Sequence, residues 1–279
     1  MYLVIGASGN VGGAVVDRLL DSGKQVRVFT RDSAKIARWG DRVQLVIGDF
    51  EKPESFAPAF AGIEAAFLMN GGDTAQFTRL VAAAKAQGSP RLVFLSTIFA
   101  AVPGIHIGKL HHDKEDAIRA SGLPAAFVRP GGFMSNSYQW IGSIKAEGAV
   151  YNAMGTGQSA PIAPQDIAAV AVQALNSAEL AGQVYEVTGG ELLSVPQQVA
   201  ILAEVLGRPL RCVDVPVEAA VQGLIRGGVP PAIAAIIGQS FEAVRDGGSA
   251  MLRDTVEKVT GRPAQTFKAW AQQHAAHFA

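Results

Sequence analysis

The first thirteen residues, MYLVIGASGNVGG, restrict the fold of this chain more than any other stretch. Tyr2–Ile5 is a short apolar run typical of a strand buried on both faces. Gly6, Gly9 and Gly12 follow at three-residue spacing, and a helical period begins at Gly13. A strand, a glycine-rich turn and a helix in this order are the setting of a dinucleotide-binding fingerprint.

Each glycine has a physical reason to be there. Gly6 permits a tight turn, Gly9 lets backbone N–H groups approach a pyrophosphate, and Gly12 lets the helix pack close to the strand. The amino-terminal end of the helix presents its unpaired N–H groups to the anion. The sequence therefore predicts a dinucleotide site in this turn.

Composition narrows the class of protein. The chain has 279 residues, enough for one large domain or one and a half, and 49% of them are hydrophobic. Lys and Arg together number 24, as do Asp and Glu, and no basic stripe occurs, which argues against a nucleic-acid partner.

The single Cys212 excludes a disulfide framework and a cysteine metal cluster, so we expect a buried thiol and no metal site. No apolar run reaches the ~18 residues of a membrane span, and the first strand leaves no room for a signal peptide, so we expect a soluble cytoplasmic protein.

Apolar runs alternate with helical periods along the first two thirds of the chain, which predicts a parallel, doubly wound, Rossmann-like α/β sheet. After Tyr2–Ile5 we expect strands at 25–30, 43–47, 65–69, 91–95, 123–129 and 183–187. We expect helices at 74–87, 111–121, 133–145, 166–175, 195–206, 232–244 and 265–278, and a short strand at 210–213. Residues 1–130 and about 163–188 would form the NAD(P)-binding domain. A small C-terminal α+β lobe on the substrate side would consist of residues 131–162 and 189–279, with approximate boundaries.

Ligands of such sheets bind beyond the carboxyl ends of the strands. Arg31 follows the second strand, where an arginine suits the 2′-phosphate of NADP, although the adjacent Asp32 and simple solvation are alternatives. Asp49 and Phe50 follow the third strand and could meet the adenine, whereas helix capping by Asp49 is the other interpretation. We expect the nicotinamide to lie near the residues that follow later strands. We also expect it to lie near the Pro-Gly-Gly loop at 130–132 and the wall after it. The expected cofactor contacts are Gly6, Ser8, Gly9, Asn10, Val11, Gly12, Arg31, Asp49, Phe50, Met69, Asn70, Ser96, Thr97, Pro130, Gly131, Gly132 and Phe133.

Several motifs resemble the NmrA-like group of atypical short-chain dehydrogenases/reductases. They are GASGNVG at 6–12, TRD at 30–32, VIGDF at 46–50, HxxxExxxxxSG at 111–122 and FVRPGGFMSN at 127–136. The similarity covers most of the chain and weakens from about residue 215 to 260. Within the family, the chain is most similar to the type-2 NAD(P)H:quinone oxidoreductases. The resemblance implies a Rossmann domain with a small lobe, an NADPH site and reductase activity.

The chain departs from the usual short-chain dehydrogenase pattern at its catalytic pair. None of the four tyrosines has a lysine four residues on, so the Tyr-x-x-x-Lys dyad is absent. Many NmrA-like members keep a lysine near the start of the helix at 111–121, where this chain has His111 and His112 flanked by Lys109 and Lys114. We expect His111 and Lys114 to be catalytic, because a histidine can polarise a carbonyl near neutral pH. Capping or solvation is the alternative, and adjacent histidines point about 100° apart, so at most one faces the site.

The main functional hypothesis is hydride transfer from NADPH to a quinone or a similar small conjugated acceptor. Phe99, Phe133, Asn136 and Trp140 would line the acceptor pocket. A clavine-type iminium or alkene reductase is one alternative, and a non-catalytic NAD(P)-sensing regulator is another. His274 and His277, on the terminal helix, are expected to be surface residues. The oligomeric state is open, with a homodimer as one possibility.

Overall fold

The computed structural model describes residues 1–102 and 104–279. Its centre is a seven-stranded parallel sheet with the order β3-β2-β1-β4-β5-β6-β9. The strands are β1 (Tyr2–Ile5), β2 (Val26–Thr30), β3 (Val43–Ile47), β4 (Ala65–Leu68), β5 (Arg91–Leu95), β6 (Ala125–Pro130) and β9 (Val184–Val187). The order reverses between β1 and β4, and a ligand crevice is expected at such a switch point. The predicted doubly wound sheet is confirmed.

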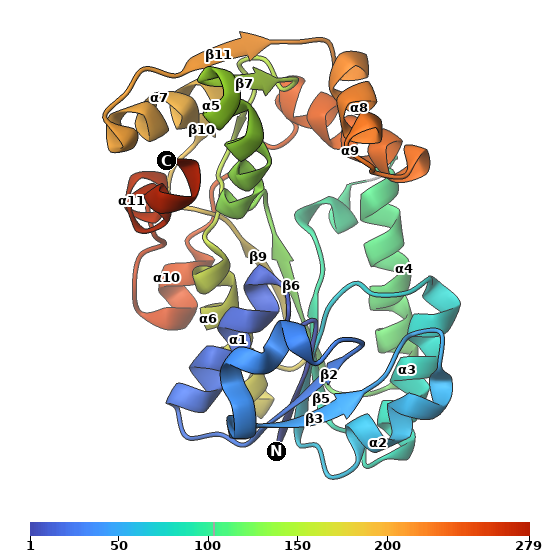
Figure 1. Cartoon of the computed structure of the whole chain (residues 1–279). Helices are drawn as coiled ribbons and strands as arrows, with labels where there is room; N and C mark the ends of the chain where they lie inside the picture. Colours follow the sequence, from blue (N-terminus) through green and yellow to red (C-terminus); the bar gives the residue numbers. More distant parts are fainter. Residues whose placement is uncertain (103) are drawn as a thin grey trace.

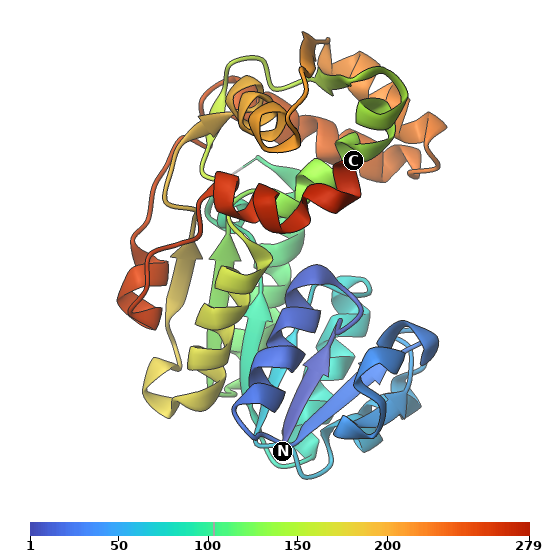
Figure 2. The same cartoon turned by 60° about the vertical axis from the view of Figure 1, so that its left-hand side comes forward.

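Helices cover both faces of this sheet (Figures 1 and 2). One face carries α1 (Asn10–Asp21), α6 (Pro164–Asn176) and α10 (Thr255–Thr260), and the other carries α2 (Phe56–Phe60), α3 (Thr74–Ala86) and α4 (His106–Ser121). Side chains of β1 alternate between the two cores: Val4 packs toward α1 and α6, and Leu3 and Ile5 pack toward α2 and α3. Both faces are buried because the crossover helices cover them, which explains the unbroken apolar run of β1.

A smaller α+β lobe lies beyond the carboxyl ends of the strands (Figure 1). In it β7 (Ala149–Asn152) pairs in parallel with β11 (Arg211–Asp214), and β8 (Gln158–Ser159) pairs antiparallel with β10 (Leu193–Ser194). Its helices are α5 (Ile141–Glu147), α7 (Val195–Leu206), α8 (Val217–Arg226), α9 (Pro231–Arg245) and α11 (Phe267–Phe278). Phe267, Trp270 and Phe278 fill its core. No helix in the described ranges is long and apolar enough to cross a membrane.

Three expectations about local structure were wrong. Helix α4 begins at His106, several residues earlier than predicted, and its first turns pack tightly on the preceding segment: a Cβ on Gly108 would lie 2.1 Å from the Phe99 carbonyl oxygen. The stretch at 98–107, for which no helix or strand was predicted, contains the short 3₁₀ segment Ile98–Ala101 and the start of α4, and residue 103 lies outside the described residues. The expected helix at 133–145 is divided into a 3₁₀ segment, Met134–Trp140, and α5. Cys212 is half-buried rather than buried.

Candidate cofactor and acceptor site

The glycine-rich turn between β1 and α1 has the close contacts that its sequence predicts. Gly6 has a φ of +87°, and Gly12 passes so near it that a Cβ on Gly12 would lie 2.2 Å from the Gly6 carbonyl oxygen. Gly9 is the N-cap of α1, and the neighbouring Ser8 and Asn10 are exposed. The turn therefore leaves an open, uncrowded helix amino terminus, which fits a pyrophosphate.

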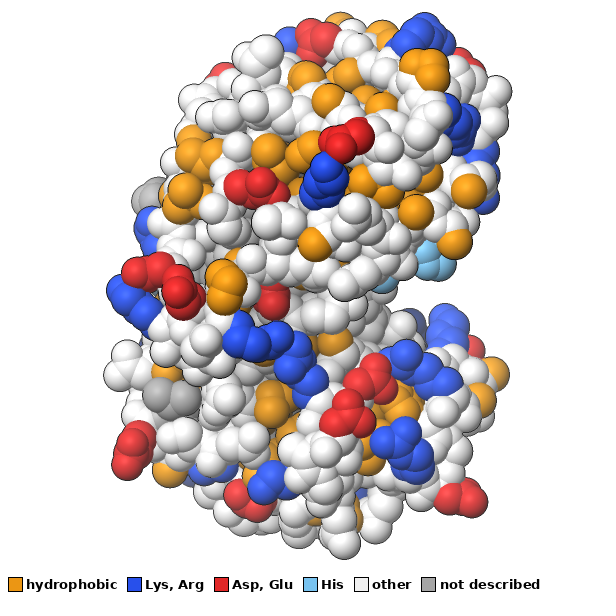
Figure 3. Space-filling model, turned by 90° about the vertical axis from the view of Figure 1, so that its left-hand side faces the viewer, with side chains coloured by type: hydrophobic (Ala, Val, Ile, Leu, Met, Phe, Trp, Pro, Cys, Tyr) orange, Lys and Arg blue, Asp and Glu red, His pale blue; other side chains and the backbone are white. Residues whose placement is uncertain are grey.

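A cavity of about 680 Å³ separates this turn from the smaller lobe. Figure 3 shows the surface hollowed between the two lobes, with histidine atoms at the upper edge of the hollow. Lys35 and Arg38 also line this cavity. Sequence reasoning missed both, because basic side chains on a short segment, here the 3₁₀ segment Ala34–Arg42, are typical of solvated surface.

Across the cavity, His274 was expected at the surface but is half-buried: its Nδ1 lies 2.8 Å from the Tyr138 hydroxyl, and its ring lies 4.6 Å from that of Trp270.

The segments that follow β2 and β3 bring Arg31 close to Asp49, with Phe50 next to it in the chain. The Arg31 side chain is 77% exposed, and its Nη1 lies 4.0 Å from Asp49 Oδ2. Asp49 Oδ1 accepts a hydrogen bond from the Glu51 N–H at 3.2 Å. Asp49 does not cap a helix, because the N-cap positions of the next two helical segments are Lys52 and Ser55. Phe50 packs beneath Gly71, where a Cβ would meet its ring at 2.5 Å. Arg31 is thus free to turn toward a ligand, whereas Phe50 supports the loop after β4.

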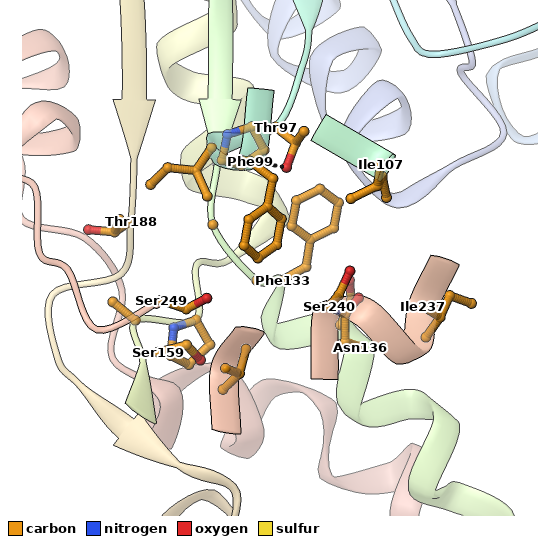
Figure 4. A pocket seen from close by; sticks show the side chains of 18 of the residues that line it. Thr97, Phe99, Ile107, Phe133, Asn136, Ser159, Thr188, Ile237, Ser240 and Ser249 are labelled. Atoms are coloured by element: carbon orange, nitrogen blue, oxygen red, sulfur yellow. Dashed lines mark hydrogen bonds between the residues drawn. The ribbon is translucent and has the colours of Figure 1, made fainter. Parts of the chain in front are cut away.

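A second cavity, of about 660 Å³, lies beyond the carboxyl ends of β5 and β6 (Figure 4). It collects residues that the sequence places far apart. Its lining includes eight residues predicted as cofactor contacts, Met69, Asn70, Ser96, Thr97, Pro130, Gly131, Gly132 and Phe133. It also includes His111 and the residues predicted for the acceptor pocket, Phe99, Phe133, Asn136 and Trp140. We call this space the acceptor cavity. Ser135 lines both this cavity and the first one.

Sequence reasoning missed the wall that the smaller lobe contributes. Ile237, Ser240, Phe241 and Val244 of α9 line the acceptor cavity, as do Ser249 and Met251 after that helix. The α9 residues recur at the spacing of one helical face, so the signal was present in the sequence. That spacing does not tell whether a face meets a core or a cavity.

His111 is held by a chain of hydrogen bonds that begins at Lys114. The Lys114 ammonium donates to Asn70 Oδ1 and, at 2.7 Å, to the Gly72 carbonyl, and Asn70 Nδ2 lies 2.8 Å from His111 Nε2. An ammonium can only donate, so the amide oxygen faces Lys114 and the amide NH₂ donates to His111. His111 Nε2 therefore accepts, which leaves the ring proton on Nδ1. This Nδ1 is buried and has no partner among the described residues.

Burial sets the charge of these groups. It lowers the pKa of His111 to about 4, with a further contribution from the Lys114 charge, so the imidazole is neutral at neutral pH. Burial also lowers the pKa of Lys114 to about 8, although Asp73 opposes this shift. Lys114 is not among the residues that line the acceptor cavity, and its ammonium is engaged by Asn70 and the Gly72 carbonyl. His112 is exposed, with its Nε2 3.3 Å from Asp116.

A buried carboxylate ties α4 to the ends of β5 and β6. Glu115 Oε1 accepts from the Ser96 hydroxyl at 2.5 Å and from Arg129 Nε at 2.8 Å, and Oε2 accepts from Arg129 and Arg119. Burial alone would raise the pKa of Glu115, but the hydrogen bonds from Arg129 and Ser96 outweigh it and hold the pKa below its usual range. This ion pair fixes Ser96 and the residues around Arg129 relative to His111.

The fold and the turn define a dinucleotide-binding protein of the Rossmann class. The chain belongs to the NmrA-like family, whose model matches residues 2–271. It is 38% identical to a (4-alkanoyl-5-oxo-2,5-dihydrofuran-3-yl)methyl phosphate reductase of Streptomyces griseus, over 100% of this chain and 99% of that protein. It is 35% identical to an NAD(P)H azoreductase of Xenophilus azovorans, with the same coverage. The NADPH-dependent quinone oxidoreductase QOR2 of Escherichia coli, solved with NADPH, has the same fold, with a TM-score of 0.88 at 22% identity over 99% of this chain and 100% of that chain.

Proposed function

We propose that this chain is an NAD(P)H-dependent reductase that transfers hydride to a quinone or a similar small conjugated acceptor. The observation that carries the proposal is that Ser135 lines both cavities, so that they lie next to each other. A dinucleotide with its pyrophosphate at the turn of Ser8, Gly9 and Asn10 would extend past Ser135 to the loop at 130–133. The aromatic side of the acceptor cavity begins there, with Phe133 and Phe99 (Figure 4).

The residues present fit NADPH. The turn has no side chain that would block a pyrophosphate, and the exposed Arg31 can meet a 2′-phosphate through a charge-assisted contact. Bound NADPH would supply the hydride. The names of the two relatives at 38% and 35% identity, a reductase and an NAD(P)H azoreductase, support the same class of reaction.

This chain would contribute a hydrogen bond in place of the missing tyrosine. A quinone oxygen gains negative charge as the ring accepts hydride, and a preorganised donor stabilises that charge. We assign this role to His111 Nδ1–H, which is buried without a partner among the described residues and whose tautomer is fixed through Asn70. Because the imidazole is already neutral, it would orient and stabilise the oxygen while water delivers the proton.

The test is oxidation of NADPH, and of NADH in parallel, in the presence of quinones, an azo dye and an activated alkene or iminium. Turnover of quinones, faster with NADPH, is the expected result. Preferred turnover of the alkene or iminium would indicate the clavine-type alternative. Cofactor binding without turnover of any acceptor would contradict the proposal. It would favour an NAD(P)-sensing regulator, which the absence of the Tyr-x-x-x-Lys pair also favours.

A further inference from the structure

The lining of the acceptor cavity contains no acidic or basic side chain other than His111 among the residues that the structure describes. His111 is neutral at neutral pH, because burial depresses its pKa. The walls are aromatic and aliphatic, with Phe99, Phe133, Trp140 and Phe241 as the rings. The remaining polar groups are hydroxyls and amides.

Basic side chains occur close to this lining in the chain, but each is already bonded. Lys114 donates to Asn70 and to the Gly72 carbonyl, and Arg129 is paired with the buried Glu115. Arg245, which follows Val244 in the chain, forms an ion pair with Asp214. Arg253, two residues after Met251, forms an ion pair with Glu186. An anion in the acceptor cavity would therefore lose its hydration without gaining a cationic partner, and burying an unpaired charge is costly.

The uncharged polar groups of the lining include four that Figure 4 labels near the rings. In this view Ser159 and Ser249 lie below and to the left of Phe99 and Phe133, and Asn136 and Ser240 lie below and to their right. The Ser249 hydroxyl oxygen is buried and has no partner among the described residues. Neutral donors near aromatic walls suit a flat ring that carries carbonyl oxygens.

We infer that the acceptor cavity selects uncharged, planar carbonyl acceptors and discriminates against acceptors that carry a phosphate, sulfonate or carboxylate. The inference rests on the proposed function and narrows its substrate class. It also separates this chain from the Streptomyces relative, whose name specifies a methyl phosphate substrate.

The experiment compares a naphthoquinone with its ring sulfonate as NADPH-dependent acceptors. The sulfonate withdraws electrons and makes the ring a stronger hydride acceptor, so chemical reactivity alone favours the charged member. We expect kcat/KM for the neutral quinone to be at least about 100-fold higher, equivalent to about 2.7 kcal/mol of discrimination. An equal or higher value for the sulfonate would overturn the inference.

A binding measurement keeps the inference testable if neither quinone is reduced. Naphthol and naphthol sulfonate are redox-inert mimics, and their Kd values for the NADPH complex follow from tryptophan fluorescence. Tighter binding of naphthol by about tenfold or more supports selection of uncharged rings even if the proposed reduction fails. Equal binding, or tighter binding of the sulfonate, contradicts it.

A positive charge introduced into the lining should reduce the discrimination. Asn136→Lys places an ammonium on the cavity wall and should raise kcat/KM for the sulfonate, relative to the neutral quinone, by about tenfold. Gln222→Lys introduces the same charge on the exposed surface of α8 and should leave the ratio unchanged. If both lysines change the ratio equally, the selection comes from the overall charge of the protein and not from the cavity.

Discussion

His111 Nε2 accepts a hydrogen bond from Asn70 Nδ2 at 2.8 Å, and the orientation of that amide is set by Lys114 on the same helix as the histidine. Two helical residues are thus coupled through a side chain from the end of β4. The coupling places the single imidazole proton on Nδ1 without any carboxylate, the more familiar partner for orienting a histidine.

Lys114→Met should raise the pKa of His111 above its value of about 4. The substitution removes a positive charge that opposes protonation and frees the Asn70 amide to turn its oxygen toward the ring. An NMR titration of the imidazole C–H resonances measures the shift. Lys109→Met removes an exposed lysine that pairs with Asp113 on the same helix and is the matched control. An unchanged His111 pKa in Lys114→Met would contradict the coupling.

The buried His111 should make the protein sensitive to acid. Between pH 6.5 and about 4 the unfolded chain binds a proton at this residue and the folded chain does not, so the free energy of unfolding falls as the pH falls. The contribution amounts to about 3 kcal/mol across the window. Urea unfolding at neutral and acid pH should show a smaller decrease in His111→Gln than in the parent protein. His112→Gln, at an exposed position, should keep the parent's decrease.

Glu115→Gln should destabilise the fold by about 3–5 kcal/mol, because it leaves Arg129 buried without a counter-charge. Thermal unfolding reports the loss. Asp116→Asn, next to it on the helix, affects an exposed carboxylate that contacts Arg119 and His112, and should change stability by less than about 1 kcal/mol. Similar effects in the two variants would mean that the Glu115 pair contributes no more than a surface pair.

Gly12→Ala should weaken both the fold and NADPH binding. The new Cβ would lie 2.2 Å from the Gly6 carbonyl oxygen, so α1 must move away from the turn. We expect a loss of about 1–3 kcal/mol of stability, typical of overpacking. Gly142→Ala in α5 has no neighbouring atom within 4 Å of its Cβ and should be neutral or stabilising. Full NADPH affinity in Gly12→Ala would show that the close approach is not needed for binding.

Arg31→Ala should weaken NADPH binding by about 1–3 kcal/mol, the scale of one charge-assisted contact, and leave NADH binding nearly unchanged. Isothermal titration with both cofactors measures the difference. Arg226→Ala removes an exposed arginine of α8 and should affect neither cofactor. Equal weakening of both cofactors by Arg31→Ala would rule out a contact with the 2′-phosphate.

The sheet and the glycine-rich turn could be predicted because their signals are local. An unbroken apolar run marks a strand covered on both faces, and the close approach of Gly12 to Gly6 tolerates no Cβ. Asp73 shows the same principle, since its capping box with Gln76 is encoded within four residues. The two-residue strands β8 and β10 were not predictable, because such short strands exist only through their pairing with each other.

The chemistry of the site was predictable by residue type but not by orientation. His111 and Lys114 were both identified, yet the sequence does not show that Asn70, more than 40 residues away, engages the lysine. Glu115 and Arg129 read as ordinary charged residues, because a sequence does not distinguish a buried pair from solvated ones. The α9 wall depends on the approach of the smaller lobe, which periodicity does not specify.

The separate origins of the two cavities have a consequence for how such a protein can diversify. The turn that would hold the pyrophosphate lies within the first dozen residues, whereas one wall of the acceptor cavity comes from α9 and the segment after it. Substitutions at Ile237, Ser240 or Phe241 can therefore alter which molecule is reduced without disturbing Gly6, Gly9 or Gly12. Selection can act on the acceptor through the late part of the gene while the nucleotide site at its beginning stays under an independent constraint.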